Sequence, residues 1–191
     1  MRTVNLPLSL RERDGVRVPA PVLDTESPRT APPFLSVLAV ALCTLTTACG
    51  TESACGPSAG TVTRVIDGDT VVLASGERVR YLLVDTPEST GGKRECFGAE
   101  ASALNRELTE GRMVRLRYAE ACTDRYGRLL AYVTVDGREV NTQLVERGHA
   151  CVLYIPPAGE SRRAEFKALE AAARQARRGL WGACDSVPCA R

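Results

Sequence analysis

The sequence contains a single histidine, few aromatic residues and almost no net charge. The lone His149 argues against a histidine-based metal centre and against a Ser-His-Asp catalytic arrangement. One Trp, five Tyr and three Phe leave few side chains for an extended base-stacking surface. The 25 basic and 23 acidic residues give a net charge of +2, so bulk charge does not indicate nucleic-acid binding. Any recognition of phosphate must therefore come from a local site.

No Cys-x-x-Cys pair occurs among the eight cysteines, which argues against a zinc site. Six of the cysteines follow Cys49, at positions 55, 96, 122, 151, 184 and 189. In an oxidising compartment such an even set predicts up to three disulfides, whose pairing stays open. We expect at least one bridge, and Cys184 with Cys189 is the most accessible pair because few residues separate them. Cys151 best fits the alternative of a free, buried core residue.

An uncharged apolar run, residues 34–48, lies near the N-terminus. It is too short to span a bilayer comfortably and has the length of the central part of a secretion signal. A buried helix of the fold is the alternative, but polar, proline-rich flanks favour export. Residues 45–49 (LTTAC) resemble the cleavage box of bacterial lipoproteins, although Thr46 stands where leucine is usual. We assign residues 1–48 to an N-terminal extension and export signal. We expect either a lipid on Cys49, attaching the protein to the cell envelope, or simple secretion.

The remaining chain divides into a linker at 49–59, a folded domain at 60–183 and a cysteine-containing tail at 184–191. Apolar alternation and Gly-centred turns predict strands at 61–66, 70–74, 78–84, 113–118, 129–135 and 138–140. Helices are expected at 97–110, from a cap at Asn141 to a stop at Gly148, and at 161–178. This pattern predicts an α+β, mainly β domain: a five-stranded OB-fold barrel with three α-helices.

Three polar clusters within this pattern carry the chemistry: residues 67–70 (DGDT), residues 80–88 (RYLLVDTPE) and residues 124–128 (DRYGR). Together with residues 97–102 (FGAEAS) and 130–133 (LAYV), they resemble the staphylococcal nuclease family. The resemblance extends in order and spacing from about Gly60 to Trp181. It implies a nuclease of the thermonuclease type that acts on DNA and RNA with the help of Ca²⁺.

Asp69, Asp85 and the carbonyl of Thr86 are the candidate metal ligands. Two carboxylates and a carbonyl make an oxygen-only site, which suits Ca²⁺ rather than Zn²⁺. Pro87 biases Thr86 to an extended conformation and has no N–H of its own. The resemblance assigns the same three residues to calcium. The simpler interpretation of residues 67–69, a hairpin turn, is compatible with a metal ligand there.

Arg80, Glu88 and Arg128 are the candidate catalytic residues. Phosphodiester hydrolysis needs an activated water and neutralisation of charge on the phosphoryl oxygens. Glu88, close to Asp85 in sequence, can act as general base, which is typically worth about 10² to 10⁴ in rate. The two arginines can bind phosphate through paired N–H groups. The resemblance implies that these three residues act together; each alone is more often structural.

Tyr126 and Tyr154 are the candidate substrate-binding residues, because tyrosines at matching positions contact the nucleotide in the family. Stacking on aromatic rings tolerates any base and is consistent with little sequence specificity. A structural role for each tyrosine stays equally open. Pro156 stands where the family's archetype has a further nucleotide-contacting tyrosine, which leaves base preference undetermined.

A catalytically inactive, nucleic-acid-binding OB-fold module is the alternative function. Loss of the catalytic Arg or Glu residues would mark that class, and here they are intact. We expect the protein to act as a monomer. Because no candidate site residue is a cysteine, reduction is expected to lower the melting temperature and to leave calcium-dependent activity largely intact.

Overall fold

The computed structural model describes residues 54–189 of the chain. The expected export signal at 34–48 and the candidate lipid site at Cys49 lie outside the described residues. Within residues 54–189, no helix is both long enough and apolar enough to cross a membrane.

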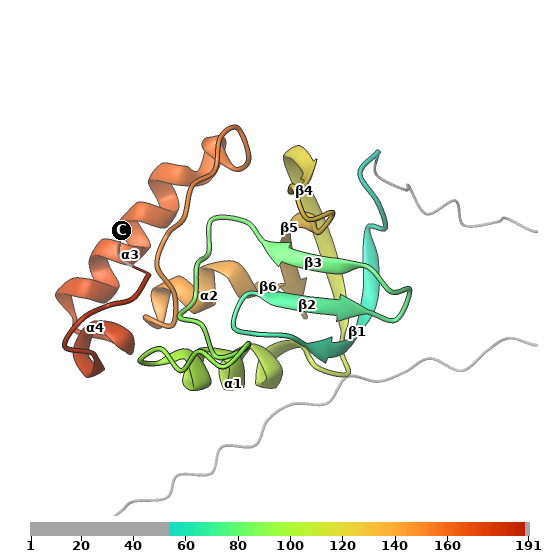
Figure 1. The fold of residues 1–191 in the computed structure, drawn as a ribbon. Helices are drawn as coiled ribbons and strands as arrows, with labels where there is room; N and C mark the ends of the chain where they lie inside the picture. The colour runs from blue at the N-terminus through green and yellow to red at the C-terminus, as the bar shows by residue number, and fades with distance from the viewer. Residues whose placement is uncertain (1–53, 190–191) are drawn as a thin grey trace, which may run out of the picture. The chain divides into compact units, whose positions relative to one another are not determined.

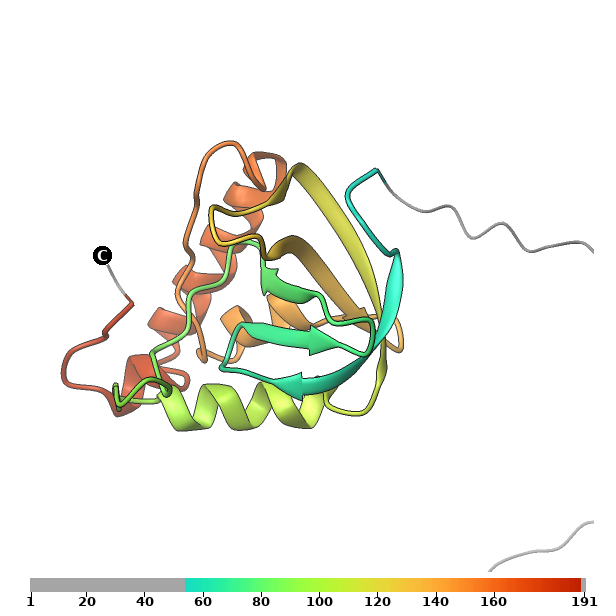
Figure 2. The same cartoon turned by 45° about the vertical axis from the view of Figure 1, so that its right-hand side comes forward.

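One mixed, mostly antiparallel sheet closes on itself to form the body of the domain (Figures 1 and 2). Its strands are β1 (Ala59–Val65), β2 (Thr70–Leu73), β3 (Arg78–Tyr81), β4 (Met113–Thr123), β5 (Leu129–Val135) and β6 (Arg138–Glu139). They lie in the order β3-β2-β1-β4-β5-β6, and a parallel pairing of β3 with β5 closes the first five into a barrel. β6 only extends one edge by two residues. The predicted α+β, mainly β class and the five-stranded OB-fold barrel are confirmed.

The three expected helices are α1 (Gly98–Thr109), α2 (Val140–Glu146) and α3 (Arg163–Gln175). α1 contacts β1, α2 contacts β5, and α3 packs on α2. Both views in Figures 1 and 2 show α1 running below β1 and β2. Fully buried side chains from strands and helices, among them Val62, Val79, Val133, Leu144 and Phe166, form the core. The barrel is therefore held against the helices by one continuous apolar cluster.

Two details of the helices differ from expectation. α3 is shorter than residues 161–178, because a 3-10 turn (Glu160–Arg162) precedes it and a separate turn, α4 (Leu180–Ala183), follows Gly179. Asn141 was expected to cap α2, but Glu139 is the N-cap and Asn141 lies inside the helix, fully buried. Its side chain accepts the N–H of Val133 at 2.9 Å and donates to the carbonyl of Leu82 at 2.9 Å. Asn141 satisfies backbone groups of the barrel, a long-range role that a local capping rule does not detect.

Three disulfides join segments that are distant in sequence: Cys55–Cys122, Cys96–Cys184 and Cys151–Cys189. The expectation of at least one bridge is confirmed. The expected pairing of Cys184 with Cys189 is wrong, because the fold places each beside a different and more distant partner. Cys151 is buried as expected, with 1% of its surface exposed, but it is bridged and not free.

The described part of the expected linker is attached to the barrel. Cys55 is bridged to Cys122, and the hydroxyl of Tyr118 donates to the carbonyl of Pro57 at 2.8 Å. The N–H of Leu116 donates to the carbonyl of Ser58 at 2.8 Å. Residues 55–58 therefore lie along the edge of β4, just before β1 begins.

Candidate active site

The turn between β1 and β2 carries the first carboxylates of the site. The N–H of Ile66 donates to the carbonyl of Thr70 at 2.9 Å, and the N–H of Asp69 donates to Oδ1 of Asp67 at 3.1 Å. A Cβ on Gly68 would lie 2.6–2.7 Å from side-chain atoms of Thr86. Only glycine, which has no Cβ, lets this turn lie so close to the segment that carries Asp85 and Thr86.

Asp69 is buried, and its carboxylate is held by several donors. Oδ2 accepts the N–H and the hydroxyl of Thr86 at 2.9 and 3.0 Å, while Oδ1 accepts the hydroxyl of Thr70 at 3.0 Å. Nε of Arg80 forms an ion pair with Oδ1 at 3.2 Å. Asp69 and Thr86, predicted separately from two clusters, are thus in direct contact.

Arg80 links the two candidate carboxylate ligands. Its side chain is 12% exposed, and its NH2 group lies 3.3 Å from Oδ1 of Asp85 while Nε reaches Asp69. The backbone of Asp85 is fixed by a pair of hydrogen bonds with Cys151, at 2.9 and 2.8 Å. Arg80, Asp69, Asp85 and Thr86 therefore form one connected cluster.

Asp67 is a further member of this cluster. The sequence predicted only a turn at this residue. Burial and the neighbouring charge of Asp69 raise the pKa of Asp67 to about 7. Its backbone carbonyl accepts the side-chain amide of Asn105 at 2.9 Å, and Asn105 in turn accepts the hydroxyl of Tyr81. The spacing of two aspartates around Gly68 was the signal for this acidic pair.

The donor set fits a hard cation in its chemistry. Within residues 54–189, no three His, Cys, Asp or Glu side chains converge on one point. The candidate set instead contains two carboxylates, Asp69 and Asp85, and the Thr86 carbonyl, an all-oxygen combination typical of Ca²⁺.

Glu88 lies on the same segment as Asp85 and Thr86, at its exposed end. Pro87 before it is buried, so the segment leaves the protein interior at Glu88. The N–H of Glu88 donates to the carboxylate of Glu95 at 2.7 Å. The side chain of Glu88 is exposed to solvent, and a water molecule can reach it there.

Arg128 is positioned by Asp124 in the turn between β4 and β5. Oδ1 of Asp124 accepts the N–H groups of Tyr126 and Arg128 at 2.9 and 3.0 Å, and Oδ2 accepts Nε of Arg128 at 2.7 Å. Burial alone would raise the pKa of Asp124, but hydrogen bonds from Arg128 and Tyr126 outweigh it and lower the pKa. The local signal for Asp124 was its place at the start of the DRYGR run.

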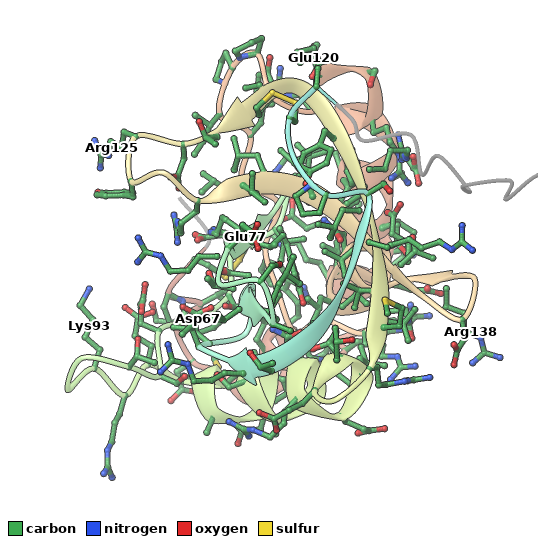
Figure 3. The ribbon with its side chains drawn as sticks, turned by 90° about the vertical axis from the view of Figure 1, so that its right-hand side faces the viewer. Asp67, Glu77, Lys93, Glu120, Arg125 and Arg138 are labelled. Atoms are coloured by element: carbon green, nitrogen blue, oxygen red, sulfur yellow. A yellow bond between two sulfur atoms is a disulfide. The ribbon has the colours of Figure 1, made fainter. Side chains whose placement is uncertain are left out.

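The two candidate arginines line the same cavity, which has a volume of about 500 Å³. Arg80, Arg128 and Tyr126 line it, with Leu83 and Leu130 among its apolar lining residues. In Figure 3, Asp67 lies on the side of the barrel from which the loops carrying Arg125 and Lys93 project. The cavity therefore combines guanidinium groups with an apolar wall, a combination suited to a phosphate with an attached sugar or base.

The two candidate tyrosines are placed differently. Tyr126 lines the cavity, is 58% exposed, and has the guanidinium of Arg128 5.5 Å from its ring centroid. Tyr154 is not among the cavity-lining residues; its ring packs against the guanidinium of Arg163 at 4.6 Å. A hydrogen bond with Glu160 raises the pKa of Tyr154. Pro156 and Ile155 line the cavity in its place.

Comparison with known proteins gives consistent matches. The family described as Staphylococcal nuclease homologue matches residues 78–183. Endonuclease YncB of Bacillus subtilis (strain 168) is 39% identical over 128 residues, covering 63% of this chain and 60% of that protein. The SPbeta prophage-derived endonuclease YokF of the same organism is 38% identical over 128 residues, covering 63% and 43%. Thermonuclease of Staphylococcus intermedius is 38% identical over 101 residues, covering 50% and 60%. The matched region thus spans less than two thirds of each of these relatives.

Proposed function

Because this chain belongs to the staphylococcal nuclease family, we propose that it is a calcium-dependent nuclease that hydrolyses DNA and RNA with little sequence specificity. The observation that carries this proposal is the shared cavity of Arg80 and Arg128, next to the cluster of Asp69, Asp85 and Thr86. Relatives whose names include endonuclease or thermonuclease support the same activity.

In the proposed reaction, Glu88 accepts a proton from a water molecule as that water attacks phosphorus in line with the leaving oxygen. Arg80 and Arg128 donate N–H groups to the non-bridging oxygens, whose negative charge increases in the transition state. Asp69, Asp85 and the Thr86 carbonyl would hold Ca²⁺, which when bound neutralises further charge on the phosphoryl group. Tyr126 contacts the base or sugar at the rim of the cavity.

The proposal is tested by cleavage of plasmid, single-stranded DNA and RNA by purified protein, with Ca²⁺ and with a chelator. We expect cleavage of all three in Ca²⁺ and none in chelator. Glu88→Gln should lower kcat at least about 10²-fold, because it removes the base without changing the shape of the side chain. Binding of nucleic acid without cleavage would instead identify an inactive binding module.

We also propose that the protein is exported and acts as a monomer, anchored through Cys49 or secreted. Three disulfides support this proposal, since such bridges persist in oxidising compartments. Mass spectrometry of the mature N-terminus from the producing cell distinguishes a lipid on Cys49 from simple secretion.

A further inference from the structure

The backbone of Glu88 is held on both sides by one other residue, Glu95. The N–H of Glu88 donates to Oε2 of Glu95 at 2.7 Å, and the N–H of Glu95 donates to the carbonyl of Glu88 at 3.0 Å. Both polar backbone groups of Glu88 therefore have the same partner. A carboxylate that accepts a backbone N–H forms a charge-assisted bond, stronger than a bond between neutral groups.

The first turn of α1 closes against the same backbone. The N–H of Gly98 donates to the carbonyl of Glu95 at 3.0 Å. A Cβ on Gly98 would lie 2.7 Å from the carbonyl oxygen of Glu88, so the missing side chain permits this close approach. The hydroxyls of Ser89 and Ser102 are 2.6 Å apart and tie the next residue of the loop to α1.

A covalent bond fixes the other side of Glu95. Cys96, the next residue, is bridged to Cys184, which ends α4. α4 is itself anchored by Leu180, which is fully buried and whose N–H donates to the carbonyl of Gly148 at 2.8 Å. Glu95 is therefore hydrogen-bonded to Glu88 through its side chain, and through the neighbouring Cys96 it is covalently connected to the end of α4.

We propose that Glu95 is a positioning residue for Glu88, and that the Cys96–Cys184 bridge holds Glu95 in place for this task. The inference rests on the proposed role of Glu88 as general base. An exposed glutamate on a loop needs such support, because a displacement of about 1 Å can cost up to about 10²-fold in rate. Glu95 touches no reacting atom; it acts through the backbone of Glu88.

The test compares Glu95→Ala, Glu95→Asp and Glu95→Gln with the wild type, in Ca²⁺ and on single-stranded DNA. Glu95→Ala removes the hydrogen-bond acceptor, and Glu95→Asp shortens the side chain that carries it. Each should lower kcat by about 10-fold, with KM within about 2-fold of the wild-type value. Glu95→Gln keeps an oxygen at the same reach and should retain at least about half of kcat. Glu107→Ala, which removes an exposed carboxylate on α1, is the matched control and should retain wild-type kcat.

A double-mutant cycle with Glu88→Gln separates positioning from general stability. If Glu95 acts through Glu88, Glu95→Ala should have no further effect on kcat in the Glu88→Gln background. An equal loss in both backgrounds, or full turnover of Glu95→Ala and Glu95→Asp, would overturn the proposal. Wild-type turnover of Glu88→Gln would overturn the general-base role itself, so failure of the proposed mechanism gives a different result from failure of the positioning role.

Discussion

Opening two disulfides of similar loop length should have different effects on turnover. The perturbations are the paired changes Cys96→Ala with Cys184→Ala, and Cys55→Ala with Cys122→Ala. The bridges join residues separated by 88 and 67 positions. The chain-entropy relation assigns them about 4.6 and about 4.4 kcal/mol of stability at 25 °C. Both double variants should therefore lose stability to a similar extent.

Turnover should fall in only one of the two variants, because of these two bridges only Cys96–Cys184 supports the segment that carries Glu88. Loss of the Cys96 bridge releases Glu95, and we expect kcat to fall by about 10-fold. Near Cys122, the turn that holds Arg128 keeps its own contacts: the N–H of Asp124 donates to the carbonyl of Arg128 at 3.0 Å. There we expect kcat to stay within about 2-fold.

The assay combines thermal unfolding with initial rates on single-stranded DNA in Ca²⁺, at a temperature where circular dichroism shows both variants folded. A loss of about 4.5 kcal/mol corresponds to a melting temperature lowered by roughly 16 °C for a domain of this size. Equal kcat in the two folded variants would refute the reasoning. The expectation from sequence, that reduction leaves activity largely intact, would then hold after all.

Three further outcomes are expected. Asp124→Asn should lower the free energy of unfolding by about 1–2 kcal/mol near neutral pH, measured by urea unfolding. Because the pKa of Asp124 is lowered in the folded state, this difference from wild type should shrink as the pH falls below about 3.9. Gly98→Ala should destabilise the protein by about 1–3 kcal/mol and lower kcat, since its Cβ would press on the Glu88 carbonyl; unchanged kcat and melting temperature would contradict this. If Cys49 carries the lipid, Cys49→Ala should release the protein from the membrane fraction or block its processing, as followed by immunoblot.

Local sequence rules were sufficient for the elements whose boundaries depend on turns. β5 begins and ends at 129 and 135 as expected, because turns centred on Gly127 and Gly137 lie on either side of it. β4 continues five residues beyond the expected end at Tyr118. Its extension pairs again with β5 at Thr123 after an irregularity in the register, a contact between strands that alternation within one strand cannot predict.

The candidate site was also predictable only in part, because local clusters were visible in the sequence and their contacts in space were not. The clusters at 67–70 and 80–88 were recognised separately, and the fold brings Asp69, Arg80 and Thr86 into contact. Glu95 and Tyr154 lie in loops, and their positions depend on the path of each loop relative to the barrel, which local sequence patterns do not predict. Disulfide pairing likewise depends on three-dimensional distance, so the short spacing between Cys184 and Cys189 was misleading.

The double pairing of Arg80 has a consequence for binding thermodynamics. The guanidinium already pairs with Asp69 and Asp85, so it competes with a cation for the same carboxylate oxygens. A phosphate that draws Arg80 away leaves those oxygens to the cation, and a bound cation leaves Arg80 to the phosphate. Linkage is reciprocal, so each ligand should raise the affinity of the other by the same factor. Titration calorimetry of Ca²⁺ with and without a mononucleotide would measure that factor, and the protein alone should hold either ligand only weakly.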